Sequence, residues 1–387
     1  MTVKLYDADS QLTDFTATVL ACTPIGSGYE TVLDQTAFFP NEGGQYADTG
    51  TLGGAAVSDV QLRGDILYHL TDRPLAVGER VSGHINWPER LRKMQNHTGE
   101  HIVSGLVFRR FGFNNVGFHL GSDDVTLDFD GELTREQLDE IESLANTAVA
   151  ECAPVEARYP SAEELATLEY RSKLELTENV RIVTVKGYDC CACCAPHVSN
   201  CGEIGLIKLL DFARYKGGVR IHMQCGFDAL DDYRDKYSAV SHIAETLSAK
   251  QNETAAAFDR LMEEYDRRAR EIASLRRRLV AAKVEAVRPT DGDAVIFDGD
   301  LDSQLLRMLC DGVADRCGGV AYAFSGNGSQ YAFVIASRTV DVRPVCRSLT
   351  EALGGRGGGR PTMVQGTLNA DQSQIRRFLA ANALTDK

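Results

Sequence analysis

The chain has 387 residues, of which 43% are hydrophobic and 25% are charged, a globular composition that is long enough for two or three cores and excludes disorder throughout. It contains no run of eighteen apolar residues, and its first residues lack the pattern of a signal peptide, so we expect a cytoplasmic protein with no membrane contact. The net charge of −14 argues against a general nucleic-acid binder. Residues 260–288, with nine basic and five acidic side chains, and residues 340–387, with seven and four, could still dock RNA.

The cysteines point to metal or redox chemistry rather than to disulfides. Their number, eleven, is odd, and five of them lie between Cys190 and Cys201. Clustered thiols in a chain without an export signal are typical of metal-binding or catalytic sites.

The first 86 residues predict a small antiparallel sheet or β-barrel. Apolar and polar positions alternate in short runs at 15–21, 30–34 and 65–70, and glycine-rich turns separate these runs. The loop from Phe38 to Gly50 contains a Gly43-Gly44 pair, which permits close backbone approach to a ligand, followed by Gln45. A hairpin turn is the simpler explanation of the same residues.

A helix is expected to begin near Asn86 and Trp87, with Pro88 in its first turn, and to end near residue 111. It carries His97 and His101 at a spacing of four, which places both imidazoles on one face, close enough to bind one ion. Such pairs also occur by chance, so the pair alone is weak support for a metal. Glu100 does not directly follow the first histidine, which disfavours the zinc-protease pattern.

An α/β region is predicted to extend to residue 232. A capping-box pattern at 134–137 precedes a helix, and strand-like runs occur at 125–129, 180–185 and 205–210.

The segment from Asp189 to His197 supplies the second half of a metal site. A thiolate and the imidazole of His197, together with the helical histidine pair, would satisfy tetrahedral Zn²⁺. The spacing does not decide which cysteine binds, and the candidates are Cys190, Cys191, Cys193 and Cys194. A closed structural site made of several cysteines is an alternative.

The C-terminal part combines a long helix with a small α/β domain. From residue 240 to residue 282, apolar residues recur at alternating steps of four and three, which predicts a long helix with a coiled-coil seam over residues 233–288. Strands at 294–297, 319–324 and 331–336 then alternate with helices at 302–310 and 343–353. In the glycine-rich segment 354–360, Arg356 and Arg360 suit phosphate or RNA, with a flexible linker as the alternative.

Five segments together resemble the alanyl-tRNA editing family, which comprises the free-standing AlaX proteins and the equivalent parts of alanyl-tRNA synthetase. These segments are 38–45, 94–101, 193–205, 214–220 and 354–361, the last of which resembles the DHH-associated domain. The resemblance implies an α+β multidomain chain: a β-barrel-like domain (1–86), a zinc-containing editing domain (87–232), a helical segment (233–288) and a DHH-associated domain (289–387). Because the chain starts directly with the barrel, it resembles a long free-standing editing protein.

By this resemblance, one Zn²⁺ per chain is bound by His97, His101, Cys193 and His197. The family pattern is Cys-Gly-Gly-Thr-His, and here Cys-Ala-Pro replaces Gly-Gly-Thr. The replacement puts a second thiol, Cys194, beside the implied ligand, which makes the cysteine assignment less secure than the histidines.

The implied reaction is hydrolysis of mischarged tRNA(Ala), chiefly Ser-tRNA(Ala) and also Gly-tRNA(Ala). A synthetase pocket excludes serine poorly, whereas a second pocket that hydrogen-bonds the serine hydroxyl rejects alanine. Gly43, Gly44 and Gln45 are expected to line that pocket, and His119 and Thr126 are either pocket walls or buried structural residues.

The tRNA contacts and the partners are also expectations. Arg90, Arg92 and Lys93 could meet terminal phosphates, although a solvated helix face is the default for such a run. The helical and C-terminal regions are expected to form a homodimer. The alternatives are a non-catalytic RNA-binding protein with structural zinc and a zinc hydrolase of another aminoacyl-tRNA ester, such as the threonine type.

Overall fold

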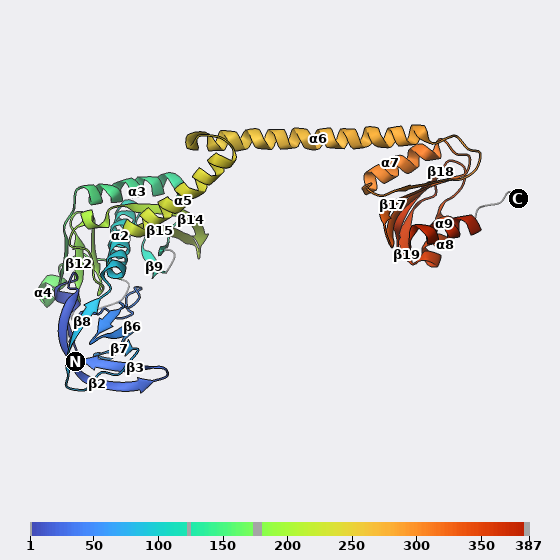
Figure 1. Ribbon diagram of the computed structural model, residues 1–387. Coiled ribbons are helices and arrows are strands. Elements are labelled where there is room, and N and C mark those ends of the chain that lie inside the picture. Colours follow the sequence, from blue (N-terminus) through green and yellow to red (C-terminus); the bar gives the residue numbers. More distant parts are fainter. Residues whose placement is uncertain (1, 122–124, 173–179, 383–387) are drawn as a thin grey trace. The chain divides into compact units, whose positions relative to one another are not determined.

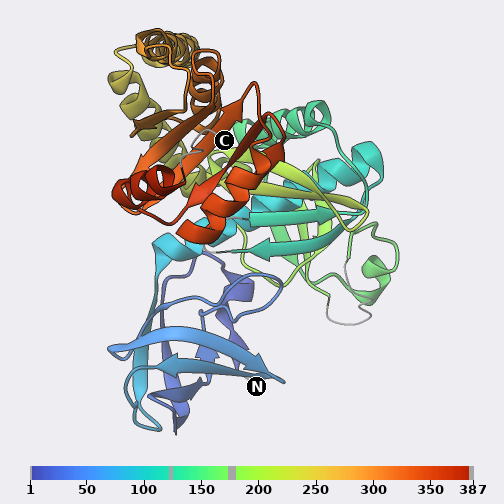
Figure 2. The same ribbon diagram turned by 90° about the vertical axis from the view of Figure 1, so that its right-hand side faces the viewer.

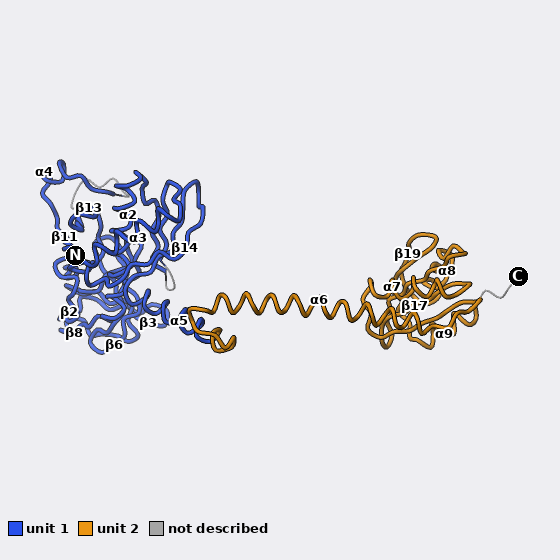
Figure 3. The backbone as a smooth tube through the Cα atoms, turned by 90° about the horizontal axis from the view of Figure 1, so that it is seen from above, with its two compact units in different colours: residues 1–242 blue, residues 243–387 orange. Residues whose placement is uncertain are grey.

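The computed structural model describes residues 2–121, 125–172 and 180–382 of the chain. These residues divide into unit 1, residues 1–242, and unit 2, residues 243–387 (Figures 1 and 3). Each unit contains its own hydrophobic cores.

A closed barrel forms the N-terminal part of unit 1 (Figure 2). In barrel order, its strands are β2 (Asp14–Ile25), β3 (Gly28–Leu33), β7 (Ile66–Thr71), β6 (Ala55–Arg63), β5 (Gly50–Leu52) and β8 (Arg80–Ile85). Alternate residues of β8 are buried, as expected for a strand with one face on a core. The short elements β1 (Val3–Lys4), α1 (Leu5–Ala8) and β4 (Gln35–Thr36) lie before and within this part, and β1 pairs with β4.

The second part of unit 1 consists of two long helices on a four-stranded sheet. Helix α2 (Trp87–Phe111) follows β8 directly, and α3 (Arg135–Ala150) starts at Thr134 with the capping box that the sequence predicts. The sheet order is β14 (Ile207–Tyr215), β15 (Gly218–Cys225), β10 (Val125–Phe129), β9 (Asn115–Leu120). The two helices contact each other and the sheet, and apolar residues of all these elements form one core.

A smaller three-stranded sheet places the cysteine-rich segment beside α2. Its strands are β11 (Val155–Arg158), β12 (Ile182–Val185) and β13 (Asp189–Ala192), with α4 (Ala162–Leu165) and the 3₁₀ turn η1 (Cys201–Ile204) nearby in sequence. Helix α2 contacts both β13 and η1, so the residues after β13 lie against the helix that carries the histidine pair.

Unit 2 is a five-stranded sheet covered on both faces. Its order is β16 (Ala294–Asp298), β17 (Val320–Asn327), β18 (Gln330–Ser337), β20 (Met363–Leu368), β19 (Gly355–Arg360). Along β17, alternate residues belong to two different cores: one contains residues of α8 (Arg343–Leu353) and α9 (Gln372–Ala381), and the other contains residues of α7 (Ser303–Ala314) and Val280. Burial on both faces explains why these strands read as continuous apolar runs.

The expected long helix is interrupted, which corrects the sequence prediction. Helix α5 (Gly226–Thr246) ends before a short connection that contains η2 (Gln251–Glu253), and α6 (Thr254–Ala286) then begins. Ser248 has φ of 51°, a left-handed conformation that ends a helix. The apolar spacing continues across the break, so periodicity alone could not reveal it.

The glycine-rich segment is a strand, neither an open loop nor a flexible linker. Residues Gly355–Arg360 form β19, which pairs antiparallel with β20 at the edge of the sheet. A Cβ atom on Gly357 would lie 2.6 Å from the ring of Phe333, so a bare backbone lets the strand approach the core.

Candidate metal centre

Three histidines and one cysteine converge in unit 1. His97 and His101 lie on consecutive turns of α2, while Cys193 and His197 lie in the segment that follows β13. One ligand atom from each of these four side chains lies within 4.8 Å of the others, and the three imidazoles are buried. The structure thus brings Cys193, and not Cys194, into the histidine group.

The spacing of the donor atoms fits a tetrahedral metal ion. Cys193 Sγ lies 3.5 Å from His97 Nε2 and 3.4 Å from His197 Nε2. Bonds of about 2.0–2.3 Å to a tetrahedral zinc ion separate its ligand atoms by roughly 3.3–3.8 Å. The donor set, three imidazole nitrogens and one sulfur, also matches the ligand preference of Zn²⁺. These four residues could therefore hold a metal ion.

Each histidine has a partner at the ring nitrogen that faces away from the group. His97 Nδ1 lies 3.0 Å from Gln45 Oε1, and His197 Nδ1 lies 3.0 Å from Thr98 Oγ1. His101 Nδ1 lies 3.1 Å from Asp189 Oδ2. This arrangement leaves the Nε2 atoms for a metal, because an acceptor at Nδ1 fixes which ring nitrogen carries the proton.

The surroundings favour a thiolate at Cys193 and a neutral imidazole at His197, whereas burial of His101 is outweighed by Asp189 and Cys193, which hold its pKa well above the usual value. Burial opposes ionisation of the Cys193 thiol, but His97, His197 and hydrogen bonds from the histidines outweigh it and hold its pKa well below the usual value. Burial lowers the pKa of His197 to about 3, despite the opposing effect of Cys193. A thiolate and neutral imidazoles are the forms that bind a metal.

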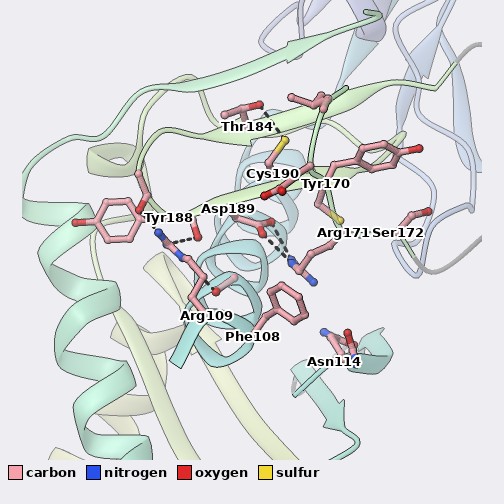
Figure 4. A pocket seen from close by; sticks show the side chains of 16 residues that line it. Phe108, Arg109, Asn114, Tyr170, Arg171, Ser172, Thr184, Tyr188, Asp189 and Cys190 are labelled. Atoms are coloured by element: carbon pink, nitrogen blue, oxygen red, sulfur yellow. Dashed lines mark hydrogen bonds and ion pairs between the residues drawn. The ribbon is translucent and has the colours of Figure 1, made fainter. Parts of the chain in front are cut away.

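A second candidate group, His101, Asp189 and Cys191, shares one histidine with the first. Arg171 forms a two-pronged ion pair with Asp189, with Nε–Oδ1 and Nη2–Oδ2 distances of 2.8 Å (Figure 4). A divalent cation on Asp189 would stand beside this guanidinium, and the repulsion disfavours it. We therefore treat Asp189 as a support of His101 rather than as a second metal ligand.

The Gly-Gly-Gln loop of the barrel part reaches the metal group. Gly44 has φ of 81°, and a Cβ atom there would lie 2.9 Å from the ring of Phe118. Leu120 N donates to Gly44 O, so the loop is attached to β9. Gln45 is fully buried, and its Nε2 has no hydrogen-bond partner among the described residues.

The other two expected pocket residues, His119 and Thr126, lie on the neighbouring strands β9 and β10. His119 is exposed on β9, where it pairs in register with Thr126 of β10, and its ring lies 6.0 Å from that of Tyr46. Phe118 is the β9 residue whose ring contacts His97, at a centroid distance of 4.8 Å.

The structure corrects the expectation that the basic residues at the start of α2 contact tRNA phosphates. Arg90 is 1% exposed; it pairs with Asp48 and donates to Ala37 O. Lys93 is 8% exposed and donates to Ala47 O at 2.6 Å. Both side chains are thus engaged inside unit 1 and cannot reach a phosphate.

The other three arginines expected to bind tRNA are Arg92, Arg356 and Arg360. Arg92 is partly exposed, and its guanidinium pairs with Asp228 and Asp231. Arg356 and Arg360 are exposed on β19 in unit 2.

Sequence reasoning missed the residues that support the ligands: Thr98, Asp189, Arg171 and Phe118. Thr98 lies in segment 94–101 and Asp189 begins segment 189–197, so their closeness in sequence to the candidate ligands could have suggested a supporting role. The position of Arg171 depends on a backbone hydrogen bond from its N–H to Cys190 O, for which the sequence has no signal.

Comparisons with known proteins match both units. Residues 180–222 match the family described as "Threonyl and Alanyl tRNA synthetase second additional domain", and residues 280–383 match the DHHA1 domain. The alanine–tRNA ligase of Ignicoccus hospitalis is 29% identical over 377 residues, which cover 93% of this chain and 40% of the relative. That of Natronomonas pharaonis is 33% identical over 392 residues, covering 94% and 42%. The chain is thus similar to the editing and C-terminal domains of alanyl-tRNA synthetases.

The chain spans about two fifths of the length of these relatives. The first matched family region contains Cys193 and His197, and the second contains β19 with its two arginines. Among solved structures, the C-Ala domain of Aquifex aeolicus alanyl-tRNA synthetase is 25% identical over 24% of this chain and 91% of that chain, with a TM-score of 0.22. Within the described residues, no helix is both long and apolar enough to cross a membrane.

Proposed function

We propose that this chain is a zinc-dependent hydrolase that deacylates mischarged tRNA(Ala), chiefly Ser-tRNA(Ala) and also Gly-tRNA(Ala). The observation that carries the proposal is the buried group of His97, His101, Cys193 and His197, contacted by Gln45, in a chain similar to alanine–tRNA ligases. A substrate of this kind supports a cytoplasmic location.

In the proposed reaction, a bound ion and the side chain of Gln45 have different roles. A bound zinc ion supplies Lewis-acid polarisation of the ester carbonyl or of an attacking water. Gln45 holds His97 through Oε1, and its buried Nε2 would donate to a substrate oxygen that completes its hydrogen bonding. A pocket donor of this kind distinguishes a seryl from an alanyl ester, because alanine leaves the buried donor unpaired.

For tRNA binding we propose the outer face of β19. Arg356, Gly358 and Arg360 alternate with residues that face the core, and a Cβ atom on Gly358 would meet no atom within 4 Å. Two guanidinium groups with a bare backbone between them suit the phosphates of an RNA strand.

For assembly we propose a homodimer through α6. Phe258, Leu261, Tyr265, Ile272, Leu275 and Leu279 continue the heptad spacing, and each is between 49% and 66% exposed. Such a seam is typical of two helices that bury their apolar faces against each other.

A second candidate is an RNA-binding protein with structural zinc. The observation that favours it is the number of ligands, because four protein ligands fill a tetrahedral zinc site, whereas catalytic sites keep one position open.

The deciding experiment is deacylation of Ser-tRNA(Ala), Gly-tRNA(Ala), correctly charged Ala-tRNA(Ala) and Thr-tRNA(Thr) by the wild type and His97→Ala. His84→Ala, which changes an exposed histidine of the barrel, is the matched control, and circular dichroism checks folding. We expect rapid loss of serine with alanine and threonine spared, abolished in a folded His97→Ala. An inactive, zinc-loaded wild type, together with a His97→Ala variant that unfolds, would support the structural-zinc candidate instead.

A further inference from the structure

The outer partner of His101 differs in charge from those of the other two histidines. His97 faces an amide oxygen, that of Gln45, and His197 faces the hydroxyl of Thr98, and both partners are neutral. His101 faces the carboxylate of Asp189, whose side chain is 2% exposed. A carboxylate behind a ligating imidazole polarises the ring and makes it a stronger ligand than a neutral acceptor does.

Arg171 fixes the carboxylate that faces His101. Its guanidinium binds both oxygens of Asp189 in the parallel geometry that restrains rotation of the carboxylate. The backbone of Arg171 is itself hydrogen-bonded to two residues of β13: its N–H donates to Cys190 O, and its carbonyl accepts from Ala192 N. Arg171 is therefore fastened to the strand that carries its partner.

A glycine on α2 permits this close approach. A Cβ atom on Gly105 would lie 2.8 Å from Asp189 Cβ and would also collide with Tyr188 O. Without a side chain at this position, the start of β13 lies directly against the helix, one turn beyond His101. The contact between Asp189 and His101 depends on that proximity.

A cavity of about 820 Å³ opens on the outer side of this pair (Figure 4). Asp189, Arg171 and Cys191 form part of its lining, with Phe108 and Arg109 of α2. A buried carboxylate without a partner would be destabilising. Arg171 therefore both neutralises the charge of Asp189 and orients its carboxylate.

We propose that Asp189, held by Arg171, is a positioning residue that sets the orientation and the zinc affinity of His101. The pair acts through His101 and does not touch the substrate. The inference rests on the zinc assignment of the proposed function, but its test measures metal binding and is independent of deacylation.

The test is the zinc dissociation constant of the full chain, measured by competition with a chromophoric chelator, for the wild type and Asp189→Asn. The isosteric amide keeps the shape and removes the charge, and we expect zinc binding to weaken about 10- to 100-fold. Asp128→Asn is the matched control. Asp128 forms an equivalent two-pronged pair with Arg220, at 2.6 and 2.7 Å, but has no contact with the metal group among those described. We expect its zinc affinity to equal that of the wild type.

A spectroscopic measurement separates positioning from general stability. With Co²⁺ in place of zinc, the visible absorption of Asp189→Asn should shift in energy or intensity, whereas that of Asp128→Asn should match the wild type. If Asp189→Asn does not fold, Arg171→Lys keeps the charge but loses the two-pronged geometry, and we expect it to bind zinc several-fold more weakly.

The outcomes are distinct from those of the deacylation assay. Zinc affinity and Co²⁺ spectra unchanged in a folded Asp189→Asn, or in Arg171→Lys where the first variant is unfolded, would overturn the inference. A wild type that binds no zinc would overturn it as well. A wild type that binds zinc, loses affinity on Asp189→Asn and hydrolyses no aminoacyl-tRNA would uphold the inference and reject the proposed function.

Discussion

At the scale of single residues, two glycines with the same backbone conformation have very different surroundings. Gly44 and Gly54 have φ of 81° and 80°, respectively, so alanine at either position suffers similar backbone strain. A Cβ atom at Gly54 meets no atom within 4 Å, whereas one at Gly44 overlaps the ring and the carbonyl oxygen of Phe118. The pair therefore separates strain from the close approach that brings Gln45 to His97.

We expect Gly44→Ala to destabilise unit 1 by about 2 kcal/mol more than Gly54→Ala, because alanine forces the loop away from β9. Thermal unfolding followed by circular dichroism measures the difference. Zinc affinity should fall only in Gly44→Ala, since Gln45 moves with the loop. Equal losses of stability in the two variants would show that the close approach of Gly44 to Phe118 does not stabilise unit 1.

A buried histidine in the barrel gives unit 1 a pH dependence. His69 is fully buried, with Nε2 2.9 Å from Thr36 Oγ1 and Nδ1 3.1 Å from Thr31 O. Burial lowers its pKa from 6.5 to about 4. Between these values the unfolded chain takes up a proton that the folded chain does not, so stability falls as the pH falls through this window.

We expect the free energy of unfolding of unit 1 to decrease by roughly 3 kcal/mol between pH 7 and pH 4 from this residue. His69→Gln, which cannot be protonated, should lose less stability over the same range. His84→Gln serves as the control, because His84 is exposed in the same barrel. Melting curves at pH 7, 5.5 and 4 would contradict the assignment if His69→Gln were as acid-sensitive as the wild type.

At the scale of secondary-structure elements, the sequence predicts those whose signals are local. Helix α2 and the capping box of α3 follow from residues adjacent in sequence, and α8 has the predicted bounds of 343–353. The break between α5 and α6 was missed because Ser248 gives no sequence signal for its left-handed conformation. Strand β19 was missed because glycine disfavours strands, and here the packing against Phe333 overrides that propensity.

The same distinction between local signals and long-range contacts applies to the residues of the candidate site. The ligands lie in motifs with recognisable spacing, so the sequence predicted His97, His101 and His197 together. For Arg90 the sequence suggested a phosphate contact, with a solvated helix face as the alternative, and its burial fits neither. Its burial depends on Asp48, which lies 42 residues away, and such pairing cannot be inferred from one sequence.

The exposed seam of α6 leads to a prediction about assembly. We expect Ile272→Glu together with Leu275→Glu to dissociate a dimer to monomers, because two buried carboxylates would face the partner helix. Sedimentation velocity measures the change in mass. Arg270→Glu changes another residue of the same helix outside the apolar seam and should leave the mass unchanged. A wild type that is monomeric at high concentration would contradict the proposed dimer.

At the scale of the whole molecule, the candidate metal group lies entirely in unit 1. Its four residues lie between His97 and His197, whereas the cores of unit 2 draw on Val280 and later residues. Metal binding adds to the stability only of the part that folds around the ion.

We expect a zinc chelator to lower the melting temperature of unit 1 and to leave that of unit 2 unchanged. Differential scanning calorimetry of the full chain, with and without chelator, resolves two transitions if the units unfold separately. His97→Ala should reproduce the effect of the chelator on the first transition and should be insensitive to further chelation. A shift in both transitions would show that the units unfold as one.

The contacts around the metal group also constrain the order of folding. Gln45 meets His97 across 52 residues of chain, and Cys193 meets His97 across 96. Closing loops of this length costs entropy before the contacts form, so these contacts come late in folding. During synthesis, His97 leaves the ribosome 96 residues before Cys193, so the two histidines of α2 emerge well before Cys193 and His197. The complete group of four donors can therefore form only after His197 has emerged.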